Sequence, residues 1–233
     1  MTPKFSIVIP ANNEENYLPK TLESINNQNY KDYEVIVVAN GCTDKTVEVV
    51  TNLINDFGFP NLRLLRLEAA NVSRARNYGA SKSQGEVVIF LDADTTLEPD
   101  SLQKINQNFT EEFSSATAKV RPDDDRFKFK FAMWFKNTYR KLGFSYSCGG
   151  MLACRRNFFE AVNGYDHTVV VMEHKGLLNK LRSYGDHCYV DTYTTTSMRR
   201  LNEWGLLKVA WFWVKQGVKD KLGWKKNDYS RVR

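Results

Sequence analysis

Short apolar runs alternate with amphipathic segments through residues 1–115 of the chain. Four runs are rich in β-branched residues and have the composition of strands buried in a parallel sheet: residues 5–9, 33–38, 62–67 and 87–91. Three segments between them carry apolar residues at helical spacing: roughly residues 16–27, 45–57 and 71–83. This alternation predicts an α/β fold, with a Rossmann-like, mostly parallel sheet flanked by helices.

The pattern changes after Phe109. We expect strands at residues 116–120, 148–154 and 188–191, and helices at residues 155–162, 173–184 and about 201–222. Residues 127–142 are aromatic and basic together, which suits either a wall of a binding site or part of the core. The sequence therefore predicts one domain over residues 1–198, with halves at 1–115 and 116–198, followed by a basic amphipathic helix and tail at 199–233.

Two carboxylates, Asp92 and Asp94, directly follow the apolar run at residues 87–91. Ligands of open α/β sheets collect beyond the carboxyl ends of the strands. Two carboxylates at that edge, one residue apart, can share a hard divalent cation that also binds phosphate oxygens. Aspartates after a strand also serve as turn formers or helix caps, so the pair by itself leaves both interpretations open.

The composition is that of an ordinary globular protein, with 42% hydrophobic and 26% charged residues. No apolar run reaches the roughly 18 residues that span a bilayer. Lys4 leads straight into the first predicted strand, so we expect no signal peptide and a cytoplasmic location. Four scattered cysteines without a C-x-x-C pair favour free thiols over a zinc site or disulfides.

The net charge of +6 is concentrated at the C-terminal end. Residues 1–198 carry 23 basic and 24 acidic side chains, whereas residues 199–233 carry 10 basic and 3 acidic ones, a balance of +7. A nucleic-acid-binding domain would carry its basic residues on the folded body. The charge pattern therefore argues against nucleic acid as a partner.

Four motifs occur in order along the chain: residues 6–15 (SIVIPANNEE), 34–46 (EVIVVANGCTDKT), 74–79 (RARNYG) and 90–94 (FLDAD). Together they resemble the family 2 glycosyltransferases, which have the GT-A fold. The resemblance is strong over residues 5–100 and weaker beyond. It implies that residues 1–115 bind a nucleotide-sugar and that residues 116–198 form the acceptor half.

On the donor side, the resemblance implies that the loop after the first strand contacts the nucleotide of a UDP- or GDP-sugar, through Pro10, Ala11, Asn12 and Glu14. The family often has two carboxylates where this chain has Ala-Asn at residues 39–40. The identity of the nucleotide therefore stays open, and Asn40 remains able to hydrogen-bond a base edge.

The same resemblance assigns donor contacts to a second group of residues: Arg76, Asn77, Asp92, Ala93 and Asp94. Within this group, Asp92 and Asp94 correspond to the family's D-x-D, which holds Mg²⁺ or Mn²⁺ on the donor diphosphate. Arg199 and Arg200 suit additional contacts to phosphate, because arginine matches phosphate geometry. Their alternative is a solvated surface charge.

In the second half, the family usually opens a helix with Glu-Asp, whose Asp is the general base for the acceptor hydroxyl. This chain has Glu173 and His174 there. Either side chain is a candidate base, since a neutral imidazole accepts protons near pH 7. A catalytically weak chain and a surface position for His174 are the alternatives, and Asp166 is more typical of a turn.

These residues predict a metal-dependent, inverting glycosyltransferase that moves one sugar from a nucleotide-sugar to an acceptor hydroxyl. The cation would stabilise the charge of the departing diphosphate. Nucleotidyl transfer is less favoured, because the loop after residue 9 has neither Gly nor Lys for a phosphate cradle. A non-catalytic sugar-nucleotide-binding or scaffold protein is the other alternative, and it is supported by His174 at the usual position of the acid.

The last predicted helix places six apolar side chains on one face, with lysines 208, 215 and 219 beside it: Trp204, Leu207, Trp211, Val214, Val218 and Leu222. Tryptophan with snorkelling lysine is typical of a helix in a membrane interface. The pattern is compatible with peripheral attachment to an anionic inner leaflet and a glycan, lipid-linked or membrane acceptor. Packing of the same helix on the core is the alternative.

Overall fold

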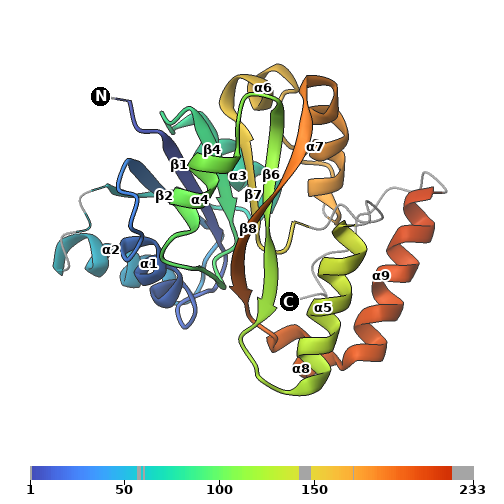
Figure 1. Ribbon diagram of the computed structural model, residues 1–233. Helices are drawn as coiled ribbons and strands as arrows, with labels where there is room; N and C mark the ends of the chain where they lie inside the picture. The colour runs from blue at the N-terminus through green and yellow to red at the C-terminus, as the bar shows by residue number, and fades with distance from the viewer. Residues whose placement is uncertain (1, 57–58, 60, 142–147, 170, 222–233) are drawn as a thin grey trace.

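The computed structural model of the protein describes residues 2–56, 59, 61–141, 148–169 and 171–221. Its centre is an eight-stranded mixed sheet in the order β3-β2-β1-β4-β7-β6-β8-β5, covered by helices on both faces (Figure 1). The strands are β1 (Phe5–Ala11), β2 (Tyr33–Asn40), β3 (Leu62–Leu67), β4 (Val87–Leu91), β5 (Thr95–Leu97), β6 (Phe113–Pro122), β7 (Met151–Arg155) and β8 (Asp186–Thr196).

The first four strands form the parallel part of the sheet. β1 pairs in parallel with β2 and β4, and β2 pairs in parallel with β3. Every residue of β4 is buried, as expected for a strand covered on both faces. The α/β class and this Rossmann-like parallel half are confirmed.

Two hydrophobic clusters occupy the two faces of the sheet. One cluster holds α1 (Leu18–Asn26), α2 (Thr46–Asp56) and α4 (Ser101–Asn108), through residues such as Leu22, Val50 and Ile105. The other holds α3 (Val72–Ser81), α6 (Arg156–Ala161) and α7 (Glu173–Leu181), through residues such as Ala75 and Leu178. A 3-10 turn, η1 (Arg182–Tyr184), follows α7. These helices hold the carboxyl ends of β1, β2 and β4 at one edge.

The second half of the sheet is mixed. β7 runs antiparallel to both β4 and β6, while β6 and β8 are parallel. The sequence pattern missed β5, which is short and pairs with the distant β8. It also missed α4, which has just two apolar residues, Leu102 and Ile105, both of them buried. β8 is also longer than the predicted 188–191, since its threonine-rich end pairs with β6 and β5.

Three helices lie together at one flank of the molecule, away from α1 and α2 (Figure 1). They are α5 (Phe127–Lys141), α8 (Arg199–Trp204) and α9 (Leu206–Lys221). The single helix predicted from residue 201 to about 222 is wrong, because Gly205 adopts φ +78 and separates α8 from α9. Residues 222–233 of the predicted tail and Leu142 lie outside the described residues. Within the described chain, no helix combines the length and the apolar character needed to span a bilayer.

Candidate functional site

The loops after β1 and β2 are bonded to each other at the carboxyl edge of the sheet. The Asn12 side-chain amide donates to the backbone oxygens of Asn40 (2.6 Å) and Gly41 (3.0 Å). The backbone N–H of Glu14 donates to the Thr46 hydroxyl at 2.8 Å. The two loops meet because parallel strands end at the same edge of the sheet.

The Asp92-Ala93-Asp94 segment at the end of β4 is fixed by backbone bonds to three other elements. The N–H of Asp92 donates to the oxygen of Gly150 (2.8 Å), and the Thr21 hydroxyl donates to the oxygen of Ala93 (2.8 Å). The N–H of Ser197 donates to the oxygen of Asp94 (3.2 Å). The two carboxylates are therefore presented by a backbone that β7, α1 and the end of β8 hold in place.

Gly150 has a specific role in this arrangement. Its φ of +87 favours glycine, and a Cβ on it would lie 2.5 Å from the Thr95 hydroxyl oxygen. The backbone of β7 can therefore approach the segment after β4 closely enough to accept the bond from Asp92. The sequence signal for this close approach is the Gly-Gly pair at residues 149–150.

Arg76 of α3 joins the first carboxylate of the pair to Glu173 at the start of α7. Its guanidinium donates to Asp92 Oδ1 (2.8 Å) and to Glu173 Oε1 (2.7 Å), and its side chain is only 3% exposed. It also lies against the Tyr165 ring, with Cζ 5.4 Å from the ring centroid. Burial would lower the pKa of Arg76, but Glu173 and Asp92 raise it above its ordinary value, so the cation is permanent.

Glu173, the first residue of α7, is ionised at neutral pH. Burial would raise its pKa, but His174 and the Arg76 guanidinium outweigh burial and hold the pKa below the ordinary value. Burial lowers the pKa of His174 itself to about 4, so the imidazole is neutral near pH 7 and Arg76 is the charge that persists there. A buried carboxylate beside one fixed arginine is therefore available as a proton acceptor.

The His174 side chain contacts Tyr165 in the protein interior as well as lying near Glu173. Its Nδ1 lies 2.9 Å from the Tyr165 hydroxyl, and its Nε2 lies 3.7 Å from Glu173 Oε1. The Tyr165 ring packs in turn against Phe90 and Phe159. A surface position for His174 is ruled out, because its side chain is only 16% exposed.

Arg199, the first residue of α8, joins the second carboxylate of the pair to the loop after β1. It donates to both carboxylate oxygens of Glu14 (2.8 and 2.6 Å) and lies 3.3 Å from Asp94 Oδ2. Its guanidinium also lies over the Tyr17 ring, 4.4 Å from the centroid, and the side chain is 33% exposed. The sequence did not identify Tyr17, and no local pattern marked it.

The two arginines near Asp94 do not fully offset the burial of its carboxylate and the charge of Asp92. Burial and the neighbouring Asp92 carboxylate raise the pKa of Asp94 to about 6, although Arg199 and Arg200 act in the opposite direction. A carboxyl whose ionisation is this costly would be stabilised by a further cation.

The chemistry of these side chains fits a divalent metal ion such as Mg²⁺ or Mn²⁺. Asp92 and Asp94 supply hard oxygen donors, and a cation bound there would favour the ionised form of Asp94, whose pKa is raised by burial and by the Asp92 carboxylate. No group of three or more His, Cys, Asp or Glu side chains that could hold a metal is present in the described ranges. Two protein carboxylates therefore suit a cation that takes its remaining ligands from a diphosphate and water.

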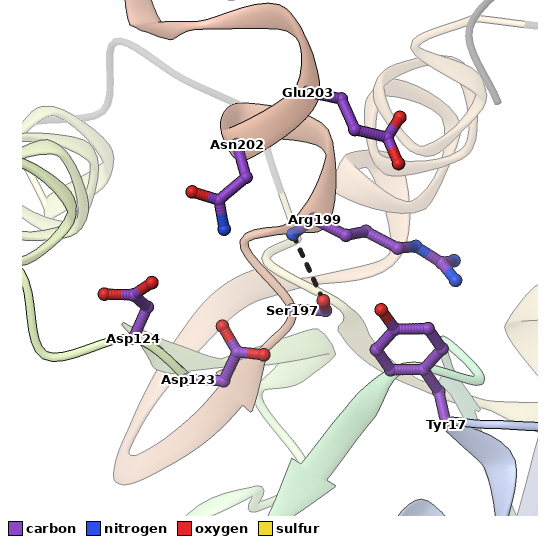
Figure 2. Close-up of a pocket in the computed structure, with 7 residues that line it drawn as sticks. All are labelled: Tyr17, Asp123, Asp124, Ser197, Arg199, Asn202 and Glu203. Carbon is purple, nitrogen blue, oxygen red and sulfur yellow. Dashed lines mark hydrogen bonds between the residues drawn. The ribbon is translucent and has the colours of Figure 1, made fainter.

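A pocket of about 370 Å³ opens beside Arg199, between the start of α1, the loop before α5, and α8 (Figure 2). Figure 2 shows the Arg199 side chain extending over the pocket toward Tyr17. The lining is polar, and three of its seven residues are acidic: Tyr17, Asp123, Asp124, Ser197, Arg199, Asn202 and Glu203. Part of it is already engaged, since Asp123 accepts from the Met198 N–H (2.8 Å). Such a lining suits a hydroxyl-rich ligand.

Other predicted site residues lie at the same edge in structural positions. Asn40 is buried, and its Oδ1 accepts from the Asn71 N–H (2.8 Å). Asn77 bonds both backbone groups of Tyr165 and so fixes the turn that precedes α7. Pro10 and Ala11 are the buried last residues of β1, and Arg200 contributes through its charge on Asp94.

The turn interpretation of Asp166 agrees with the structure. Its Oδ1 accepts from the N–H (2.8 Å) and hydroxyl (2.7 Å) of Thr168, and this bonding keeps the pKa of Asp166 below its ordinary value. The residue closes a turn and lies outside the bridges made by Arg76 and Arg199.

Comparison with protein families gives a match to the model described as "Glycosyl transferase family 2" over residues 6–162. Glycosyltransferase GlyA of Streptococcus pneumoniae is 36% identical over 110 residues, which are 46% of this chain and 15% of that protein. GalNAc(5)-diNAcBac-PP-undecaprenol beta-1,3-glucosyltransferase of Campylobacter jejuni is 33% identical over 117 residues, 48% of this chain and 38% of that protein. The matched segments span less than half the length of these relatives.

Solved structures share the fold at low sequence identity. S. aureus TarS 1-349 in complex with UDP-GlcNAc aligns with a TM-score of 0.67 and 18% identity over 84% of this chain and 59% of that one. Mannosyltransferase PcManGT from Pyrobaculum calidifontis, in complex with GDP-Man and Mn²⁺, aligns with a TM-score of 0.68 and 17% identity over 91% of this chain and 60% of that one. These likenesses identify the fold as GT-A.

Proposed function

The chain belongs to glycosyl transferase family 2, and from this premise we propose that it transfers a sugar from a nucleotide-sugar to an acceptor hydroxyl with inversion at the anomeric carbon. One observation carries the proposal: the buried Arg76 binds Asp92 of the donor side and Glu173 of the acceptor side at once. Catalysis by in-line displacement needs a leaving-group site and a proton acceptor held at a fixed separation.

Glu173 is the proposed general base. Its Oε1 accepts the bond from Arg76, and the proposal assigns the other oxygen, Oε2, to the acceptor hydroxyl. Its pKa lies below the ordinary value, so Glu173 is ionised at neutral pH and its carboxylate can accept a proton. His174 is proposed as a positioning residue, supported by its neutral imidazole and its contact with the Tyr165 hydroxyl at 2.9 Å.

The donor diphosphate is proposed to bind against Asp92 and Asp94. A bound divalent cation there would act as a Lewis acid on the diphosphate of the leaving group. Arg199 is proposed to bind the same diphosphate from the open side, since its guanidinium is only half-buried and already lies 3.3 Å from Asp94. Residues 10–14, Asn40 and Asn77 are proposed to shape the nucleotide side.

The identity of the nucleotide is proposed by analogy only. TarS is described with UDP-GlcNAc and PcManGT with GDP-Man and Mn²⁺. A UDP- or GDP-sugar with Mg²⁺ or Mn²⁺ is therefore the proposed donor pair for this chain.

The acceptor is proposed to be a glycan or lipid-linked saccharide that enters by the polar pocket beside Arg199. The Campylobacter relative is named for an undecaprenol-linked substrate, which supports an acceptor of this kind. We propose further that residues 199–233 attach the protein peripherally to an anionic membrane surface on the cytoplasmic side. Support comes from the balance of +7 in this segment and from the exposed Trp211, Val214 and Val218 of α9.

A donor panel tests the proposed reaction. Nucleotide release would be measured with UDP- and GDP-sugars, in Mn²⁺ or EDTA, for the wild type and for Glu173→Gln. Metal-dependent release that falls by about 100-fold or more in the variant is expected for loss of a general base. Metal-dependent binding of a nucleotide-sugar without release or transfer would instead make the protein a non-catalytic sugar-nucleotide-binding module of the same fold.

A further inference from the structure

The outer face of α5 is a continuous row of exposed aromatic rings. We define it by Phe127, Phe131, Trp134, Phe135 and Tyr139, whose exposed fractions run from 43% for Tyr139 to 82% for Phe127. Their spacing of three, four and seven residues keeps them on one side of the helix. The rings stack along the axis, with centroids 6.2 Å apart for Phe127 and Phe131 and 5.7 Å apart for Phe131 and Trp134.

The opposite face of α5 is packed against the domain. Phe129 is fully buried and Met133 nearly so, and they form a small cluster with Val120 of β6 and Met198 before α8. Asn137 adds bonds to both backbone groups of Val120 (2.9 and 2.7 Å). The helix is therefore anchored in place, and its aromatic residues face outward because a different set of apolar residues already fills the interface.

The charge of α5 is entirely positive. Residues 127–141 contain five basic side chains and no acidic one. Lys128 is exposed, with its Nζ 4.8 Å from the centroid of the buried Phe129, and the exposed Lys130 pairs with Asp125 at the end of the preceding loop. Exposed lysines on the same helix as the exposed rings distinguish this surface from a typical protein interface, where lysine is depleted.

A second exposed apolar face belongs to α9. Trp211 is 69% exposed, and Val214 and Val218 are more than half exposed. Lys208 and Lys215 fall on the same side of this helix at helical spacing and are exposed. Figure 1 draws α5 and α9 at the same flank of the molecule.

We propose that the outer face of α5 is a docking surface for an anionic lipid bilayer, with aromatic rings entering the headgroup region and lysines contacting lipid phosphates. Aromatic and aliphatic side chains flanked by lysine, on a helix too polar overall to cross a bilayer, have the character of an interfacial helix. The positive charge complements anionic lipids. The inference extends the proposed membrane contact of residues 199–233 to a helix of the folded domain, and it rests on the proposed function only for its biological purpose.

The docking surface is coupled to the candidate site by short connections. Met198 packs under α5 in the small cluster, and the next residue is Arg199, which contacts Glu14 and Asp94. The loop that leads into α5 supplies Asp123 and Asp124 to the polar pocket. A bilayer on α5 would therefore lie close to the pocket proposed for the acceptor.

Vesicle flotation of the whole chain tests the inference. Wild type should float with phosphatidylcholine vesicles that contain phosphatidylglycerol and much less with phosphatidylcholine alone. The double variant Phe131→Ser/Trp134→Ser should bind the anionic vesicles at least about tenfold more weakly, because two inserted rings are removed. Lys128→Gln should lose about fivefold on anionic vesicles and little on neutral ones.

Matched controls separate this result from misfolding and from the proposed function. Tyr184→Ser and Tyr189→Ser remove exposed rings of η1 and β8 and should bind vesicles as wild type does. The α5 variants should keep the wild-type thermal unfolding and nucleotide release without vesicles.

Binding by the Phe131→Ser/Trp134→Ser variant that equals wild type would overturn the inference, even if deletion of residues 206–233 abolishes flotation. A wild type that stays unbound but elutes as a dimer, which these substitutions dissociate, would assign the surface to a second copy instead. An inactive protein that still floats in an α5-dependent way would contradict only the proposed reaction.

Discussion

Two arginine bridges hold the Asp92–Asp94 pair, and they differ in almost every physical respect. Arg76 links Asp92 to Glu173 and is 3% exposed, whereas Arg199 links Asp94 to Glu14 and is 33% exposed. Arg76 sits in α3 within the parallel half, while Arg199 begins α8 near the C-terminal flank.

The difference separates a fixed part of the site from one that ligands can rearrange. The buried Arg76 donates hydrogen bonds to its two carboxylates, and its Nε has no hydrogen-bond partner among the described residues. Arg199 rests on the open face of Tyr17 and can exchange carboxylates for phosphate oxygens with little loss of hydration. We expect Arg76 to act through stability and alignment, and Arg199 through donor affinity.

Replacing the fixed arginine should produce the largest change. Arg76→Met leaves Asp92 and Glu173 as unpaired acids and should lower the free energy of unfolding by about 3–5 kcal/mol. Urea denaturation without metal measures this. Arg199→Met is the matched control and should cost about 1 kcal/mol or less, because the Arg199 side chain is partly exposed. Equal losses for the two variants would erase the distinction between the bridges.

The raised pKa of Asp94, the carboxylate beside Arg199, predicts that the free energy of unfolding depends on pH. The pKa of Asp94 is raised from 3.8 to about 6, so the folded state keeps its proton longer than the unfolded state does. Its contribution is fully present below about pH 4 and is lost as pH rises through about 6, by roughly 2–3 kcal/mol.

Metal-free wild type should therefore lose stability relative to Asp94→Asn as pH rises from about 4 to 7. Urea midpoints at several pH values for both proteins give the comparison. Curves that run parallel across this range would mean that Asp94 titrates normally.

Removing Arg199, the arginine that ligands can displace, should change donor affinity more than turnover. Arg199→Ala should raise the KM for the nucleotide-sugar about tenfold, equivalent to about 1.4 kcal/mol, with kcat changed much less. Arg200→Ala provides the control, since that side chain acts on Asp94 only through its charge, and its effect should be smaller. A fall in kcat at constant KM would place Arg199 in the chemical step instead.

The smallest effect is expected at Tyr165, whose ring lies against the Arg76 guanidinium. Tyr165→Phe removes the hydroxyl that lies 2.9 Å from His174 Nδ1 and should cost about 1 kcal/mol of stability. The acidic limb of the pH–rate profile should stay unchanged, because Glu173, rather than His174, is the proposed base. A change of that limb, or a loss of turnover as large as that of Glu173→Gln, would assign proton transfer to His174.

The two bridges also mark what the sequence could predict. The strand before Asp92, the loops after β1 and β2, and the α/β class followed from local composition and spacing, because each is encoded within a few residues. Glu173 and Arg76 were both named, yet nothing in the sequence indicated that they bond to each other across 97 positions.

Other features escaped prediction for the same physical reason. Tyr17 and Gly150 matter through contacts with residues far away in the chain, and β5 exists only because β8 is there to pair with it. For α5, the sequence did not distinguish a core helix from the wall of a binding site, because aromatic residues occupy both faces of the helix. Burial of Phe129 and exposure of Phe131 separate the two faces.

The central claim is that Asp92 and Asp94 bind a donor diphosphate through a divalent cation, and calorimetric titration with UDP and GDP measures this directly. The account predicts that wild type binds one of the two nucleotides in Mn²⁺ and at least about tenfold more weakly in EDTA. It also predicts that Asp94→Asn loses the Mn²⁺-dependent part of the affinity while remaining folded. Nucleotide affinity that is the same with Mn²⁺ and EDTA, or unchanged in Asp94→Asn, would contradict the account.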